Sequence, residues 1–206
     1  MQRTALMLSL ATLALAACSN PTTNGTPTPT SGGSSSPPST STSLPSGVPK
    51  VEHPIDVTRF KQDPCTALTK TQVEDLLGSP NTETVPRPDG EAGPACRWSI
   101  PSTAQPRVNV IFGSSPDGGT ASVYAAKGNT YKLVEPLESI DGYPVTAYGV
   151  VDRRAEGACS VSLGISDTET VGIAATQSTA NVGKKDPCAA AREGAIRVLA
   201  TIRGGN

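Results

Sequence analysis

The chain has 206 residues, with 17 basic and 18 acidic side chains, one histidine and 3% aromatic residues. It contains no basic run and no patch of interleaved basic and aromatic residues, so nucleic acid is not expected as a partner. A single histidine excludes a His-rich metal site and argues against a Ser-His-Asp triad.

Residues 1–17 have the pattern of a secretory signal peptide. One charge at Arg3 precedes uncharged residues rich in Leu and Ala. This run is shorter than the roughly 20 apolar residues that a membrane-spanning helix needs. Leu15-Ala16-Ala17-Cys18 looks like a bacterial lipobox, so we expect lipidation of Cys18 and anchoring through its acyl chains. The alternative is an ordinary signal peptide with a cysteine near the cleavage site by chance.

Residues 18–50 are predicted to form the lipidated start and a disordered tether. From Ser19 to Lys50, all residues except Leu44, Val48 and Lys50 are Ser, Thr, Pro, Gly or Asn. Such a segment buries too little apolar surface to offset its ordering entropy. It is either a bare linker or a stalk with O-linked sugars.

Residues 51–206 have the length of one domain and contain four cysteines. An even number in an exported domain predicts two disulfides rather than metal ligands. The sequence allows three pairings. We favour Cys65–Cys96 and Cys159–Cys188, because each closes a loop of about 30 residues within one half of the domain.

The first half of the domain is predicted to begin with two short helices, about 64–68 and 70–77. Asp63 and Pro64 are typical of a helix start, and Thr69 with Gln72 resembles a capping box. Residues 81–94 are rich in Pro, Gly and charge, and are therefore predicted to be an exposed loop.

An antiparallel sheet is predicted to follow, because several runs alternate between apolar and polar residues. A helical turn is expected at 121–127, and Pro136 limits 131–137 to an edge strand at best. The other predicted strands are 96–100, 107–112, 143–151, 158–165 and 170–176.

The longest predicted helix, about 187–203, closes the chain after Asp186. Its apolar residues recur every three or four positions and form one stripe. The expected fold is therefore α+β, an antiparallel sheet covered by N-terminal and C-terminal helices and held by two disulfides.

This arrangement resembles a known family. The lipobox, the tether, Asp63-Pro64-Cys65, Cys96-Arg97-Trp98, the strand cysteine Cys159 and Cys188 in the last helix occur in this order. Together they are similar to an actinobacterial cell-envelope lipoprotein family, catalogued as a domain of unknown function, to which the mycobacterial LprB- and LprC-type lipoproteins look related. The resemblance implies a cell-envelope lipoprotein and supplies no catalytic residues or disulfide pairing.

Few residues are candidates for a ligand site. Tyr143 and Tyr148, near Gly142 and Pro144, are predicted to line a surface groove. His53 lies beside Pro54 at the linker boundary, which offers little to hold a general base. No serine-hydrolase, penicillin-binding or phosphate-loop motif is present, so we predict no catalytic residue, no metal and no cofactor.

The sequence thus predicts a lipid-anchored protein on the outer face of the cell membrane. The leading hypothesis is that the protein is a non-enzymatic module that binds an envelope protein, glycan or lipid. One alternative is a carrier of a hydrophobic lipid between the helices and the sheet. A second alternative is a carboxylate-dependent envelope enzyme. Glu74 with Asp75, and Glu135 with Glu138, are acidic pairs for which a solvated surface is the simpler interpretation.

Overall fold

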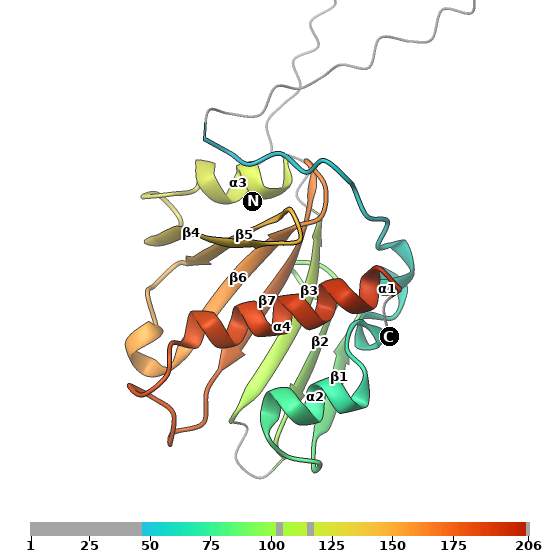
Figure 1. Cartoon of the computed structure of the whole chain (residues 1–206), viewed down its shortest axis with the longest axis vertical. Helices are drawn as coiled ribbons and strands as arrows, with labels where there is room; N and C mark the ends of the chain where they lie inside the picture. Colours follow the sequence, from blue (N-terminus) through green and yellow to red (C-terminus); the bar gives the residue numbers. More distant parts are fainter. Residues whose placement is uncertain (1–46, 102–104, 115–117, 205–206) are drawn as a thin grey trace, which may run out of the picture. The chain divides into compact units, whose positions relative to one another are not determined.

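A computed structural model describes residues 47–101, 105–114 and 118–204 (Figure 1). These residues belong to one compact unit. Its helices and short 3-10 turns are α1 (Thr58–Gln62), η1 (Pro64–Ala67), α2 (Lys70–Leu77), α3 (Gly119–Ala125), η2 (Arg154–Glu156) and α4 (Pro187–Ile202). Its strands are β1 (Glu83–Arg87), β2 (Ala95–Ser99), β3 (Arg107–Ser114), β4 (Leu133–Ile140), β5 (Tyr143–Gly149), β6 (Ala158–Gly164) and β7 (Glu169–Thr176).

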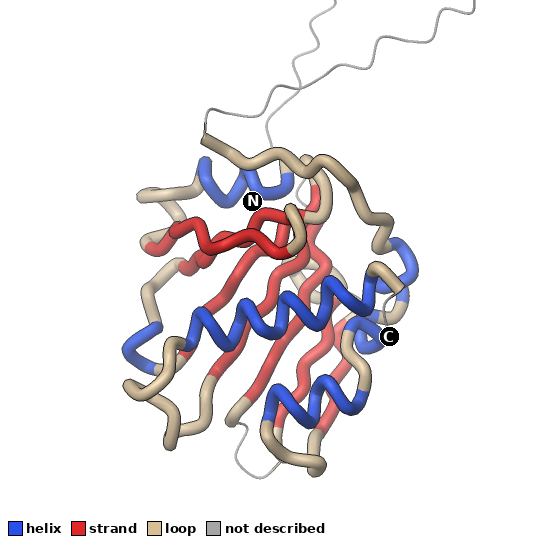
Figure 2. The backbone as a smooth tube through the Cα atoms, in the orientation of Figure 1, coloured by secondary structure: helices blue, strands red, loops and turns tan. Residues whose placement is uncertain are grey.

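The strands form one antiparallel sheet in the order β1-β2-β3-β7-β6-β5-β4. It consists of two consecutive meanders, β1 to β3 and β4 to β7, which meet where β3 pairs with β7 from Arg107↔Thr176 to Ser114↔Glu169. Figure 2 shows α2 and α4 in front of one face of the sheet, which is strongly twisted. The predicted α+β architecture is confirmed.

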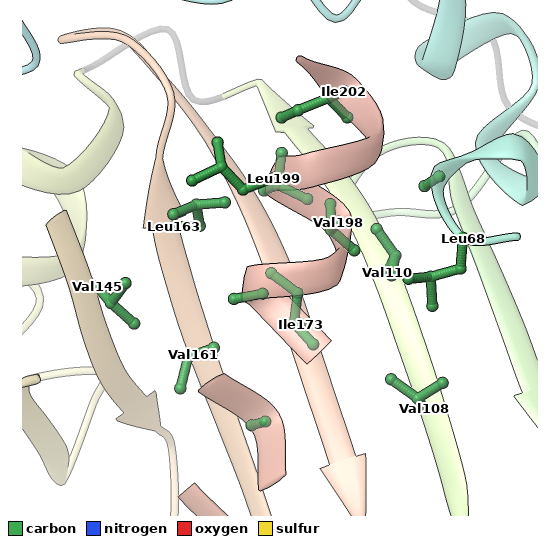
Figure 3. Packing of buried hydrophobic residues seen from close by; sticks show 14 of the residues in the cluster. Leu68, Val108, Val110, Val145, Val161, Leu163, Ile173, Val198, Leu199 and Ile202 are labelled. Atoms are coloured by element: carbon green, nitrogen blue, oxygen red, sulfur yellow. The ribbon is translucent and has the colours of Figure 1, made fainter. Parts of the chain in front are cut away.

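The hydrophobic core lies between α4 and one face of the sheet. Because side chains alternate along a strand, one set of residues on β3, β5, β6 and β7 faces the helix. Ile173 and Leu163 lie beneath Val198, Leu199 and Ile202 of α4, and all five are buried (Figure 3). The stripe predicted on the last helix is therefore the surface that covers the sheet.

Helix starts follow their sequence signals at two positions and depart from them at a third. Thr69 and Gln72 form the reciprocal capping box of α2, and Asp186 accepts a hydrogen bond from the backbone N–H of Cys188 at 2.8 Å. The prediction that Asp63 caps a helix is wrong. The backbone carbonyl of Asp63, rather than its carboxylate, accepts from Thr66, because the segment forms only a 3-10 turn.

Two elements were not predicted. The expected loop 81–94 contains β1, whose side chains are mostly exposed, so it shows no alternation and is held by backbone pairing to β2. Helix α1 has five residues and no side-chain cap, and it positions buried Phe60 against Phe112 with ring centroids 6.0 Å apart. Strand β4, which contains Pro136, is an edge strand as predicted.

The two disulfides each tie a helical segment to one meander. Cys65 of η1 is bonded to Cys96 of β2, and Cys159 of β6 is bonded to Cys188 of α4. This is the disulfide pairing that we predicted from the lengths of the loops that the bonds close. Within the described residues, no helix has both the length and the apolar character that crossing a bilayer would require.

Candidate functional site

The face of the sheet opposite α4 is polar. We call it the polar face. Its central cross-strand row consists of Arg97, Asn109, Ala174, Ser160 and Tyr148, paired in that order from β2 to β5. The next row carries Ala95, Ile111, Gly172, Ser162 and Thr146. Small side chains therefore lie in the middle of this face, with larger polar groups on either side.

Helix α3 covers one end of the polar face. A Cβ atom at Gly164 of β6 would lie 2.5 Å from Oγ1 of Thr120, so the missing side chain lets α3 approach the strand closely. Tyr131, in the segment after α3, continues this cover. Because α3 has only seven residues, the rest of the polar face is not covered by a helix.

The uncovered part forms a groove of three adjoining hollows, about 500, 340 and 200 Å³ in volume. We call it the polar groove. The first two hollows share Gly90–Gly93 and Ile111, and the last two share Arg107, Asn109 and Ala174. The two larger hollows fall within the volume range of small-ligand sites. The groove therefore runs across β2, β3, β7 and β6, from the β1–β2 connection to Tyr148.

Two buried polar atoms in the polar groove have no hydrogen-bond partner among the residues that the structure describes. They are Nε of Arg97 and Oγ of Ser162, a residue with 2% of its surface exposed. Buried polar groups are almost always hydrogen-bonded, because leaving one unpaired costs its desolvation energy. Both atoms are therefore suited to bind a polar ligand.

Tyr148 lies flat over the middle of the sheet. A Cβ atom at Gly172, two strands away, would be 3.2 Å from its hydroxyl, so the glycine makes room for the ring. Tyr131 packs edge-on against it with ring centroids 5.2 Å apart. Burial, with a smaller contribution from Tyr131, raises the pKa of Tyr148 to about 12. The hydroxyl is therefore a neutral hydrogen-bond donor at physiological pH.

The structure does not bring Tyr143 and Tyr148 together. They are five residues apart on one strand, so their side chains point to opposite faces of the sheet. Tyr148 lines the polar groove, whereas Tyr143 is buried on the helix side and donates to the backbone carbonyl of His53 at 2.7 Å. The proposed shared groove is therefore corrected to one that contains Tyr148 alone.

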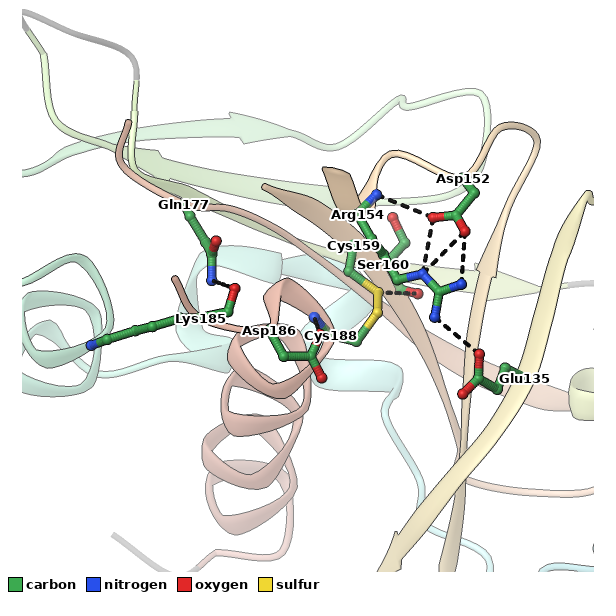
Figure 4. The surroundings of a disulfide bond; sticks show 9 residues. All are labelled: Glu135, Asp152, Arg154, Cys159, Ser160, Gln177, Lys185, Asp186 and Cys188. Atoms are coloured by element: carbon green, nitrogen blue, oxygen red, sulfur yellow. Dashed lines mark hydrogen bonds and ion pairs between the residues drawn. A yellow bond between two sulfur atoms is a disulfide. The ribbon is translucent and has the colours of Figure 1, made fainter. Parts of the chain in front are cut away.

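The disulfide between Cys159 and Cys188 lies at the start of α4 (Figure 4). Arg154, nearby in the same view, binds Asp152 and also Glu135 of β4. These groups hold the β5–β6 connection to the edge of the sheet, where Asp152 and Glu135 are both paired with Arg154. Cys18, the predicted lipidation site, lies outside the described residues.

A further hollow, of about 540 Å³, lies between α2 and α4. Two carboxylates border it, Asp75 and Glu193, and Arg197 donates to both, at 3.1 and 3.0 Å. The pair with Asp75 joins α4 to α2, whereas the pair with Glu193 lies within α4. The arrangement is that of a structural network, and it does not supply the free acid and base that a carboxylate-dependent enzyme needs.

The interface between α4 and the sheet is closely packed. Gly194 lies so near β7 that a Cβ atom there would be 3.0 Å from Cγ2 of Ile173. A lipid carrier of the predicted kind would hold its ligand at this interface, and the contact supplies no support for that function. Among the described residues, no group of three His, Cys, Asp or Glu side chains is placed to hold a metal ion.

The sequence analysis missed the arginines of the polar groove. Arg97 enters the sequence analysis only within the motif Cys96-Arg97-Trp98, of which Trp98 is buried in the core. Arg87 fell in the segment assigned to a loop. The signal was the polar set of alternate positions in β2 and β3, but only the strand register places Arg97 beside Asn109.

The fold and the groove define a disulfide-bonded α+β domain with a polar groove on one face of its sheet. The chain belongs to the family described as "Protein of unknown function (DUF3558)", whose model matches residues 13–201. Comparison with curated proteins and with solved structures gave no match.

Proposed function

We propose that this protein is a membrane-anchored, extracytoplasmic lipoprotein whose folded domain binds a component of the cell envelope and catalyses no reaction. Residues 1–17 are the signal peptide, 18–50 the lipidated cysteine and tether, and 51–206 the binding domain. The two disulfides indicate an extracytoplasmic protein, because such bonds persist in oxidising compartments.

The observation that carries this proposal is the polar groove. It presents hydrogen-bond donors from Arg97, Asn109, Ser162 and Tyr148 on a rigid sheet. Glu91 is the one acidic side chain among its described lining residues, and no histidine is among them. Donors without a nucleophile and base in contact are suited to binding and orientation of a polar partner rather than to bond cleavage.

The lipid anchor is supported by the sequence before the domain. The family match begins at residue 13 and therefore includes Cys18 and the small residues before it. Two or three acyl chains on one residue give stable membrane residence, whereas a single chain binds reversibly. The relation to actinobacterial lipoproteins of the LprB and LprC type is part of this proposal.

The anchor is tested with Cys18→Ala in the full chain, expressed in a host that lipidates such proteins. The wild-type protein is expected in the detergent phase after phase separation, with a mass increase from acylation. Cys18→Ala is expected in the aqueous phase. If the variant partitions with detergent as the wild type does, Cys18 is not the anchor.

Binding is tested by site-specific photocrosslinking in intact cells. A photoreactive phenylalanine replaces Glu91 or Val151, both exposed residues at the rim of the polar groove. The matched control carries it at Ala200, which is exposed on α4 on the other side of the sheet. Adducts from the rim positions and none from Ala200 are expected. Equal labelling at all three positions, or none at the rim, would contradict the proposal.

A further inference from the structure

Three arginines on adjacent strands have no acidic partner. The described arginines elsewhere are each bound to a carboxylate or, in one case, stacked on a phenyl ring: Arg153, Arg154, Arg192, Arg197 and Arg203 form ion pairs, and Arg59 lies over Phe60. Arg87, Arg97 and Arg107 have neither a carboxylate nor an aromatic partner among the described residues. The unpaired guanidinium groups are thus confined to one region of the domain.

The sheet register brings these three arginines together. Arg97 of β2 pairs with Val85 and Asn109, whereas Arg87 of β1 and Arg107 of β3 lie one row to either side of it. Arg97 is thus a diagonal neighbour of Arg87 and of Arg107 on the polar face, and all three residues line the same 340 Å³ hollow. Long side chains reach each other across such diagonals.

The described lining of this hollow carries a net positive charge. It contains three arginines, and Glu91 is the one acidic residue among its described lining residues. A hollow lined by one sign of charge attracts ions of the opposite sign, so this lining is suited to an anion. Arginine binds carboxylate and phosphate oxygens with two parallel hydrogen bonds, and the buried Nε of Arg97 lacks an acceptor.

The rest of the polar groove suits an uncharged, hydroxyl-rich group. Beside Asn109 the floor is formed by the small residue Ala174, with Ser160 and Ser162 of β6 beyond it, and Tyr148 lies over Gly172. Tyr148 and Tyr131 form an aromatic wall at its far side. Sugar rings are bound in this way, with hydroxyl groups on polar side chains and the ring against an apolar or aromatic surface.

We propose that the polar groove binds an acidic saccharide. Its carboxylate or phosphate group binds Arg97 and Arg107, with Arg87 at the rim, and its sugar ring lies over Ala174 and against Tyr148. This inference rests on the proposed binding function and names the class of ligand for it.

The test is a titration of the folded domain by NMR at low salt, with amide shifts as the readout. The probes are trigalacturonate, which supplies sugar carboxylates, glucose 6-phosphate, which supplies a sugar phosphate, and neutral maltotriose. At least one anionic saccharide is expected to shift amides of β2, β3 and β7 and to bind about tenfold or more tightly than maltotriose. Comparison of the two anionic probes distinguishes the carboxylate from the phosphate.

Three variants assign the binding to the groove. Arg107→Gln alone and together with Arg97→Gln is expected to weaken binding about tenfold or more. Ala174→Leu leaves the charge of the groove unchanged but places a larger side chain on its floor. This variant is expected to fold and to bind the saccharide more weakly. Arg203→Gln is the matched control, because Arg203 lies at the end of α4 and pairs with Asp141. Its affinity is expected to equal that of the wild type.

The inference is wrong if both anionic saccharides bind no better than maltotriose, if free inorganic phosphate binds as tightly as glucose 6-phosphate, or if Arg203→Gln weakens binding as much as Arg107→Gln. The proposed binding function is judged separately. If rim crosslinking still captures an envelope component, and Ala174→Leu abolishes the capture, the groove is a binding site for a ligand of another class.

Discussion

Gly194 of α4 faces Ile173 of β7 across the centre of the core. The space between them accommodates the hydrogen atom of glycine but not a larger side chain without a shift. A Cβ atom at Gly194 would lie 3.0 Å from Cγ2 of Ile173 and 3.8 Å from Cγ2 of Val108. Glycine is unfavourable inside a helix by about 1 kcal/mol relative to alanine. Its presence here is explained by the close approach of helix and sheet.

Gly194→Leu is therefore expected to destabilise the domain by about 1–3 kcal/mol, because the new side chain must displace α4 from the sheet. Denaturant unfolding measures this change. Ala200→Leu is the matched control, since Ala200 is exposed on the same helix. Its effect is expected to stay within about 0.5 kcal/mol. Equal stability of Gly194→Leu and the wild type would show that α4 can move without cost.

The disulfide between Cys159 and Cys188 closes a loop with a sequence separation of 29 residues. On the chain-entropy model, such a crosslink contributes about 3.5 kcal/mol to stability by restricting the unfolded chain. The double variant Cys159→Ala, Cys188→Ala is expected to lose this amount in denaturant unfolding. Because α4 is tied to β6 by this bond, the loss is expected to appear first as faster amide exchange in α4.

The other disulfide supplies the comparison. The variant Cys65→Ala, Cys96→Ala removes a crosslink of similar separation, 31 residues, from the first meander. It is expected to lower the stability by a similar amount but to loosen η1 and β2 rather than α4. Identical exchange patterns in the two double variants would contradict the assignment of one disulfide to each meander.

The parts of the fold that were predictable have strong local signals. The capping box at Thr69 and Gln72, the apolar stripe of α4 and the alternation in β6 and β7 each determine a local conformation, and the structure shows each of them. Disulfide pairing followed from loop length because each bond lies within one meander. Strand β1 was not predictable, because its side chains are mostly exposed and its conformation depends on β2.

The candidate site was harder to predict than the fold. Spacing along the chain made Tyr143 and Tyr148 look like neighbours, but an odd separation on a strand places them on opposite faces. The arginines of the groove come from three strands, and their proximity depends on a register that a single sequence does not display. A groove of this kind is a tertiary feature, whereas the cysteines and the lipobox are local motifs.

Asp152 accepts hydrogen bonds from the side chain and backbone of Arg154, and these hold the pKa of its carboxyl below the usual range. A lowered pKa in the folded state contributes stability above the ordinary value of 3.8, and this contribution is lost as the pH falls below it. The wild-type protein is therefore expected to be more stable than Asp152→Asn at neutral pH. This difference in stability is expected to become smaller as the pH falls. The effect is small, because the side chains of Arg154 and Asp152 are 38% and 43% exposed.

Thermal unfolding from neutral pH to acid measures this difference. Asp89→Asn is the control, because Asp89 is exposed and forms no ion pair among the described residues. Its melting temperature is expected to follow that of the wild type at every pH. A gap between wild type and Asp152→Asn that is unchanged in acid would mean that the Arg154 contact acts through geometry rather than through charge.

Tyr148 supplies the corresponding prediction at alkaline pH. Burial raises its pKa from 10.0 to about 12, so the folded protein retains the hydroxyl proton more firmly than the unfolded chain does. Such a group contributes its full stability below pH 10, and the contribution is lost as the pH rises from 10 towards 12. The free energy of unfolding is therefore expected to fall over this range, and Tyr148→Phe is expected to reduce the fall.

Absorbance at the tyrosinate band measures the ionisation directly, and denaturant unfolding measures the stability. Removal of Tyr148 is expected to remove one late ionisation, while Tyr124→Phe, on α3, leaves it in place. A saccharide bound against Tyr148 would bury the hydroxyl further and delay its ionisation in the wild type. If an ionisation near pH 12 persists in Tyr148→Phe, it comes from another tyrosine. Tyr148 would then be more exposed to solvent than its position over Gly172 predicts.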